Sequence, residues 1–179
     1  MVACHSLGSM GVKKDCFYGV KFELEQIAEM LQNRGWMLGT AESCTGGKVS
    51  AVCTAMAGSS AWFEGGIVSY ANAVKESLLQ VDSALIARHG AVSQEVAEAM
   101  ALGALDTLGV DVAVAITGIA GPSGGTVDKP VGTVWVAVGL RHPDCATLSK
   151  CFCFQGDREA IRVGASQAAF YLILQALTT

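Results

Sequence analysis

The feature that most constrains the fold is the apolar run at residues 110–117, which reads Val-Asp-Val-Ala-Val-Ala-Ile-Thr. It alternates too little for a strand with one face in water, so it predicts a strand buried on both faces. A glycine-rich loop follows at residues 118–130. A strand covered on both sides needs helices on both faces of its sheet. The run therefore predicts an α/β protein.

The elements expected around this strand fit that fold class. Apolar residues at helical spacing predict helices at residues 22–34, 48–58, 72–79, 82–88, 93–108 and 157–177. Short apolar runs predict further strands at residues 36–39, 61–70, 131–140 and 147–154. Non-helical connections between the last strands indicate antiparallel pairing. We therefore expect a three-layer α/β/α sandwich with a mixed, mostly parallel sheet of about five strands.

Composition limits the number of domains and the kinds of partner. With 179 residues, of which 51% are hydrophobic, the chain is expected to form one domain at residues 21–179 after a loose N-terminal extension at residues 1–20. A net charge of −4 and sparse Lys and Arg disfavour nucleic acid and anionic membranes as partners. No apolar stretch reaches the roughly 18 residues that a membrane span needs. Seven cysteines without a secretory signal favour a reducing, cytoplasmic setting.

The candidate site is the segment at residues 40–47, Thr-Ala-Glu-Ser-Cys-Thr-Gly-Gly, where a predicted strand gives way to a helix. In an open α/β sheet, ligands bind at the carboxyl ends of strands, and a helix N-terminus offers unpaired N–H groups to an anion. Ser43 would lie at such a point.

Two glycine-rich segments fail the nucleotide-binding motifs that they approach. The turn before Lys48 lacks the glycine that a phosphate-binding loop requires at position 42 and the Ser or Thr required at position 49. The loop at residues 118–125 misses the dinucleotide fingerprint, because Ala120 and Ser123 stand where glycine is required. That loop is either a cradle of N–H groups for an anionic or planar ligand or a flexible connection.

Ser43 needs a base to become a nucleophile. The histidines are poorly placed for this role, since even His89 precedes Gly90 and suits a helix C-terminus. Lys75 follows the second predicted strand and would approach Ser43 if the first two strands are parallel neighbours. A solvated surface lysine is the commoner state, and the spacing alone leaves both interpretations open.

The cysteines offer two further interpretations. Cys44 is a rival nucleophile, since a helix N-terminus can lower a thiol pKa, although a buried thiol more commonly acts as a small apolar group. Cys151 and Cys153, with Cys145 and His142, lack the Cys-x-x-Cys spacing of structural zinc. We therefore expect no metal.

Several motifs occur in order through residues 22–177. They are residues 41–47 (Ala-Glu-Ser-Cys-Thr-Gly-Gly), 58–63 (Gly-Ser-Ser-Ala-Trp-Phe), 70–72 (Tyr-Ala-Asn) with Lys75, 89–93 (His-Gly-Ala-Val-Ser), 118–122 (Gly-Ile-Ala-Gly-Pro) and 129–135 (Lys-Pro-Val-Gly-Thr-Val-Trp). Through them the chain resembles the C-terminal domain of the competence/damage-inducible protein CinA and the stand-alone nicotinamide-nucleotide amidases of the same family.

This resemblance implies an α/β/α sandwich and an enzyme that hydrolyses the carboxamide of nicotinamide mononucleotide to nicotinate mononucleotide and ammonia, with no cofactor. It implies Ser43 as the nucleophile and Lys75 as the general base, with Tyr70 assisting. Ala71 and Thr117 stand where relatives carry Ser, and Ser123 where Gly is frequent. These departures remove no catalytic group.

The resemblance also leads to expectations about binding. We expect N–H groups at residues 45–47 to stabilise an oxyanion, Asn72 to lie near the substrate amide and Arg158 to bind phosphate. The full set of expected substrate-binding residues is Thr45, Gly46, Gly47, Asn72, Thr117, Gly118, Ala120, Gly121 and Arg158. A homodimer is expected as the commonest state of a small enzyme. The alternative function is a non-catalytic nucleotide-binding or regulatory module linked to competence or the DNA damage response.

Overall fold

The fold is built on a single mixed sheet. A computed structural model describes residues 16–141 and 146–179 of the chain. Its strands are β1 (Leu38–Glu42), β2 (Phe63–Val68), β3 (Val112–Gly118), β4 (Thr133–Leu140) and β5 (Ala146–Cys153), in the order β2-β1-β3-β4-β5. β1 pairs in parallel with β2 and β3, whereas β4 is antiparallel to both of its neighbours. All strands except β4 therefore run in one direction, and the expected mixed, mostly parallel sheet is confirmed.

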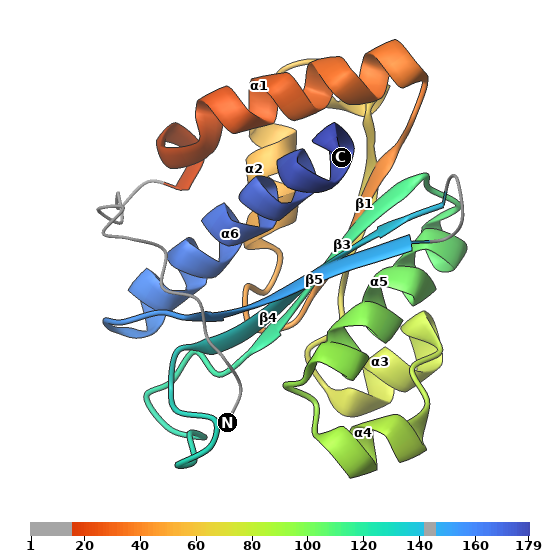
Figure 1. Ribbon diagram of the computed structural model, residues 1–179. Helices are drawn as coiled ribbons and strands as arrows, with labels where there is room; N and C mark the ends of the chain where they lie inside the picture. Colours follow the sequence, from red (N-terminus) through yellow and green to blue (C-terminus); the bar gives the residue numbers. More distant parts are fainter. Residues whose placement is uncertain (1–15, 142–145) are drawn as a thin grey trace.

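Helices cover both faces of this sheet. Figure 1 shows α1 (Cys16–Arg34), α2 (Lys48–Ala55) and α6 (Arg158–Thr178) on one face, and α3 (Asn72–Leu79), α4 (Ser83–His89) and α5 (Gln94–Leu108) on the other. A short 3₁₀ helix at Ser59–Ala61 precedes β2. The expected three-layer α/β/α sandwich is confirmed.

The central strand β3 is buried on both faces, as its composition predicts. Val112, Val114 and Ile116 belong to the apolar cluster beneath α1, α2 and α6, while Ala113 and Ala115 belong to the cluster beneath α5. Small side chains on the α5 side allow that helix to pack closely.

Several element boundaries differ from the predicted ones, and two of these differences concern the site and the core. β1 ends at Glu42 instead of residue 39, because Thr40 and Glu42 are buried polar residues with hydrogen-bonding partners; the Thr40 and Ser50 hydroxyls, for example, lie 2.7 Å apart. α1 begins at Cys16 and therefore includes the end of the segment expected to be a loose extension, and Val20 is buried in the core. Residues 1–15 lie outside the described part of the chain.

The strand order creates a crevice at one edge of the sheet. The chain passes from β1 to β2 through α2 on one face, and from β2 past β1 to β3 through α3, α4 and α5 on the other. The carboxyl ends of β1 and β3 thus meet at a topological switch point, where open α/β sheets bind their ligands. The Ser43 N–H spans this point by donating to the Ile116 carbonyl at 2.9 Å.

Within the described residues, α6 is the single helix long and apolar enough to cross a membrane by length and composition. Of its most apolar stretch, 67% is buried inside the protein. This burial against the sheet and α1 is typical of the core helix of a soluble domain.

Candidate active site

The turn after β1 places Ser43 at this crevice. The Ser43 carbonyl accepts a hydrogen bond from the Gly46 N–H at 3.1 Å, which closes a tight turn before α2 begins at Lys48. Gly46 and Gly47 have φ angles of +61° and +91°, a left-handed conformation that favours glycine. The turn therefore needs both glycines for its backbone shape.

Glu42 fixes the backbone of this turn and of the start of α2. Its fully buried carboxylate accepts hydrogen bonds from the N–H groups of Gly47 at 2.9 Å, Val49 at 3.1 Å and Ser50 at 2.8 Å, and from the Ser50 hydroxyl at 2.7 Å. The negative charge also faces the positive end of the α2 dipole. Sequence reasoning gave Glu42 no role, although an acidic residue at a strand end just before a helix start could have signalled one.

Lys75 reaches Ser43 from α3. Only 1% of the residue is exposed, and its Nζ lies 3.2 Å from Ser43 Oγ, 2.7 Å from the Ser69 carbonyl and 3.4 Å from the Tyr70 carbonyl. Burial lowers the pKa of Lys75 from its ordinary value of 10.5. A neutral amine has two N–H groups and one lone pair, which matches two carbonyl oxygens and one hydroxyl. The parallel pairing of β1 and β2 brings the two residues together.

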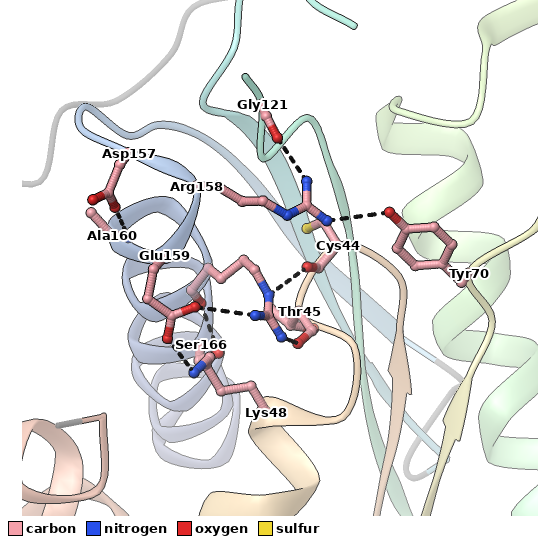
Figure 2. A network of polar contacts seen from close by, with 11 residues as sticks. Cys44, Thr45, Lys48, Tyr70, Gly121, Asp157, Arg158, Glu159, Ala160 and Ser166 are labelled. Carbon is pink, nitrogen blue, oxygen red and sulfur yellow. Dashed lines mark hydrogen bonds and ion pairs between the residues drawn. The ribbon is translucent and has the colours of Figure 1, made fainter. Parts of the chain in front are cut away.

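The Tyr70 hydroxyl contacts Arg158 instead of the Ser43–Lys75 pair. The residue is 62% exposed, and its hydroxyl lies 3.3 Å from a guanidinium nitrogen of Arg158 (Figure 2). A second nitrogen of Arg158 donates to the Gly121 carbonyl at 2.7 Å. Among the described residues, the Tyr70 hydroxyl has no hydrogen bond to Ser43 or Lys75, and it is the Tyr70 carbonyl that faces the amine. Direct assistance by the hydroxyl is therefore not part of the observed geometry.

Cys44 is a poor rival for Ser43. Burial raises the pKa of its thiol to about 12, so the thiol is neutral at physiological pH. The sulfur thus behaves as a small apolar group beside the nucleophile.

A cavity of about 280 Å³ opens beside Ser43 and Lys75. The sequence-predicted residues that line it are Ser43, Tyr70, Asn72, Lys75, Thr117, Gly118, Ala120, Gly121 and Arg158. Thr45, Gly46 and Gly47 are not among its lining residues. The Gly46 and Gly47 N–H groups already donate to the Ser43 carbonyl and the Glu42 carboxylate. The expectation that these two groups bind an oxyanion is corrected accordingly.

The cavity wall also contains two residues that sequence reasoning gave no role. Ala91 and Val92, in the segment after α4, both line it. The Thr117 hydroxyl donates to the Ala91 carbonyl at 2.7 Å, and Lys129 Nζ donates to the His89 and Val92 carbonyls at 2.8 Å each. Thr117 thus supports the wall with its hydroxyl.

Within residues 16–141 and 146–179, no group of three or more His, Cys, Asp or Glu side chains could hold a metal ion. His142 and Cys145, the other two residues of the candidate zinc set, lie outside the described residues.

Comparisons with known proteins agree with this architecture. The family model of the CinA C-terminal domain matches residues 21–177. A nicotinamide-nucleotide amidohydrolase PncC from Escherichia coli strain K12 is 48% identical over 151 residues, which cover 84% of this chain and 90% of the relative. A CinA-like protein from Mycolicibacterium vanbaalenii is 53% identical over 86% of this chain, which spans only 36% of that longer protein. The crystal structure of competence damage-inducible protein A from Klebsiella pneumoniae is 38% identical and superposes with a TM-score of 0.83, covering 88% of this chain and 96% of that one. The chain therefore belongs to the CinA C-terminal domain family.

Proposed function

We propose that this protein hydrolyses the carboxamide of nicotinamide mononucleotide to nicotinate mononucleotide and ammonia. Relatives from Escherichia coli and Enterobacter agglomerans named nicotinamide-nucleotide amidohydrolase PncC, 48% and 47% identical, support an amidohydrolase. One observation carries the mechanism: the buried Lys75 amine lies 3.2 Å from Ser43 Oγ at the wall of the cavity.

In the first half of the reaction, neutral Lys75 takes the Ser43 proton as Oγ attacks the carboxamide carbon. The Ser69 and Tyr70 carbonyls hold the amine with its lone pair toward the hydroxyl. Collapse of the tetrahedral intermediate breaks the C–N bond, and protonated Lys75 gives its proton to the leaving nitrogen, which departs as ammonia. The products of this half are an ester of Ser43 and a neutral amine.

In the second half, Lys75 removes a proton from water, which attacks the ester carbon and releases nicotinate mononucleotide with a regenerated Ser43 hydroxyl. In both halves a negatively charged oxygen forms at the carbonyl carbon. The N–H group of Cys44, a residue that lines the cavity, is its candidate donor, since among the described residues it donates to no other residue. This arrangement replaces the Gly46 and Gly47 donors.

The remaining cavity residues suit the rest of the substrate. Arg158, in the first turn of α6, supplies a positive charge for the 5′-phosphate, and Asn72 faces the same cavity near the reacting pair. The loop that begins at Gly118 would hold the nucleotide with its backbone. Tyr70, through its hydroxyl, would hold Arg158 in place.

The rest of the proposal concerns the protein's setting. We propose a single functional domain over residues 21–179, a homodimer, and a cytoplasmic location. Cys44 and Cys53 are buried and form no disulfide among the described residues, which fits a reducing environment.

A non-catalytic nucleotide-binding or regulatory module is the alternative. It would have no need for a buried lysine held against a serine hydroxyl, since an unpaired lysine is costly to bury. The geometry therefore favours the enzyme.

One assay tests the proposal. Purified protein is incubated with nicotinamide mononucleotide and the released ammonia is measured, beside Ser43→Ala and Lys75→Ala and the exposed controls Ser60→Ala and Lys21→Ala. We expect both site variants to lose at least about a thousandfold in kcat while the controls keep wild-type rates. Equal release from all variants would end the Ser–Lys mechanism. Substrate binding without any release by the wild type would favour the module.

A further inference from the structure

A second arginine of α6 contacts the turn that carries Ser43. Arg162 Nε donates to the Cys44 carbonyl at 3.2 Å, and one terminal nitrogen donates to the Thr45 carbonyl at 2.7 Å. The other terminal nitrogen lies 3.1 Å from the Glu159 carboxylate. Figure 2 shows the Cys44 and Thr45 carbonyls at the first turns of α6. The guanidinium thus joins two consecutive carbonyls of the nucleophile turn to a helix far away in the sequence.

These bonds determine where the N–H groups of the turn point. In a trans peptide the C=O and N–H bonds face opposite ways, so a Cys44 carbonyl held by Arg162 directs the Thr45 N–H away from the arginine. A Thr45 carbonyl held by Arg162 likewise fixes the next peptide, whose Gly46 N–H donates to the Ser43 carbonyl. Because the Ser43 carbonyl and the Cys44 N–H belong to one peptide, that bond directs the Cys44 N–H away from Gly46.

The Arg162 guanidinium is itself held in place by Glu159. Lys48 Nζ donates to Glu159 at 2.7 Å, and this hydrogen bond and the positive charges of Lys48 and Arg162 lower the pKa of the Glu159 carboxyl. An ionised Glu159 accepts a hydrogen bond from the terminal nitrogen of Arg162 that does not bind the Thr45 carbonyl. A lysine at position 162 could not donate to both carbonyls with the same fixed fork.

We propose that Arg162 is a positioning residue that holds the Cys44 N–H group toward the oxyanion formed at Ser43. The inference rests on the proposed function, because it assigns a role in the same reaction. Arg162 does not line the cavity and touches no reacting atom in this scheme. It acts through the peptide groups that it orients.

The chain contains a matched control. Arg141 donates through Nε to the Val110 carbonyl at 2.9 Å and through a terminal nitrogen to the Leu105 carbonyl at 2.6 Å, with Asp106 3.3 Å from its other nitrogen. This pattern of two carbonyls and one carboxylate repeats that of Arg162, but it lies where β4 ends and β3 begins, at the opposite edge of the sheet from Ser43. Arg141→Met therefore reports the structural cost of losing such an arginine without disturbing the site.

The first measurement is steady-state hydrolysis of nicotinamide mononucleotide by wild type, Arg162→Met, Arg162→Lys and Arg141→Met. We expect Arg162→Met to lower kcat by about 100-fold, as for loss of an oxyanion donor, with KM within about threefold of wild type. Arg162→Lys should lower kcat about tenfold, and Arg141→Met should keep kcat within about twofold. Melting temperatures are measured for all four proteins.

The second measurement distinguishes loss of the correctly oriented oxyanion donor from general damage to the cavity. Pyridine-3-boronic acid adds the Ser43 oxygen to its boron and places a boronate oxygen where the oxyanion forms, whereas the pyridinium analogue of nicotinamide mononucleotide without the carboxamide has no oxygen at that position. We expect Arg162→Met to weaken binding of the boronic acid about 10- to 100-fold and to change the dissociation constant of the pyridinium analogue less than threefold. Arg141→Met should change neither.

The inference is overturned if Arg162→Met keeps wild-type kcat, or if the two ligands weaken by the same factor. If Arg162→Met does not fold, Arg162→Lys decides: an unchanged kcat and an unchanged boronic acid affinity overturn the inference. A wild type that releases no ammonia would refute the proposed function instead. The ratio of the boronic acid affinity to that of the pyridinium analogue would still test Arg162, because the difference between the two ligands depends only on Ser43 and the turn.

Discussion

The Lys75 amine is held against Ser43 by two backbone carbonyls. Nζ lies 3.2 Å from Ser43 Oγ, while the Ser69 and Tyr70 carbonyls take its other two directions at 2.7 and 3.4 Å. A charged ammonium would have to donate to the Ser43 hydroxyl, whereas a neutral amine can accept its proton. The protonation state of Lys75 therefore decides whether the pair can react.

The first prediction concerns activity and pH. Because burial lowers the pKa of Lys75 below 10.5, kcat/KM should rise with pH through that lowered pKa and reach a plateau below pH 10.5. The check is ammonia release from nicotinamide mononucleotide between pH 5 and 10 at constant ionic strength, with Lys75→Ala as the control whose residual rate lacks this limb. A wild-type limb centred at 10.5 would contradict the assignment of Lys75 as base.

The second prediction concerns stability and pH. Between the lowered pKa of folded Lys75 and its ordinary value of 10.5, the unfolded state binds more protons, so the free energy of unfolding rises with pH. Relative to Lys75→Met, which does not titrate, the wild type should lose up to about 1.4 kcal/mol per pH unit as pH falls from 10.5 to the folded pKa. Below that pKa the difference should be constant. Urea unfolding of both proteins from pH 7 to 10 measures it, and a difference independent of pH would count against a depressed Lys75 pKa.

The layers and strands were predictable because they depend on local patterns. The apolar run of β3 and the helix start expected at Ser93 are read directly from neighbouring residues. In the structure β3 is buried, and the Ser93 hydroxyl caps α5 by accepting from the Val96 N–H. The site was predictable only in part. The bond from Arg162 to Thr45 joins residues 117 positions apart, and no periodicity encodes such a contact. The Tyr70 hydroxyl likewise bonds to Arg158 and not to Lys75. This pairing depends on how the loop around Gly121 packs against Arg158, which the sequence pattern does not encode.

The third prediction tests Glu42 as the support of the nucleophile turn. Glu42→Gln places an NH₂ group where the carboxylate accepts four hydrogen bonds, so at least one buried donor must face another donor. The free energy of unfolding should fall by about 3 kcal/mol, measured by urea denaturation, and kcat should fall as the turn shifts. Glu64→Gln, on the exposed part of β2, is the control and should cost less than about 0.5 kcal/mol. Equal stability of the two variants would contradict the assignment of Glu42 as the support of the nucleophile turn.

The fourth prediction tests how α3 is held. A Cβ on Gly103 of α5 would lie 1.9 Å from the Leu79 carbonyl oxygen at the end of α3, so Gly103→Ala must push the two helices apart. Because α3 carries Lys75, the shift should both lower stability by about 2 kcal/mol and reduce kcat. Gly65→Ala meets nothing within 4 Å and serves as the control, with stability and kcat near wild type. Thermal unfolding and ammonia release measure the two effects, and a Gly103→Ala variant with normal kcat would show that α3 tolerates the displacement.

The fifth prediction separates recognition of the phosphate from the chemistry. Arg158 lines the cavity and is positioned by bonds to Gly121 and Tyr70 rather than to Ser43 or Lys75. Arg158→Gln removes the positive charge from the expected phosphate site, so KM for nicotinamide mononucleotide should rise about 10- to 100-fold. Nicotinamide riboside, which has the same carboxamide but no phosphate, should be hydrolysed by wild type and variant with kcat/KM values within about threefold of each other. Arg88→Gln, at the exposed end of α4, should change neither substrate. Loss of activity toward the riboside as well would place Arg158 in the chemical step and leave the phosphate to be bound elsewhere.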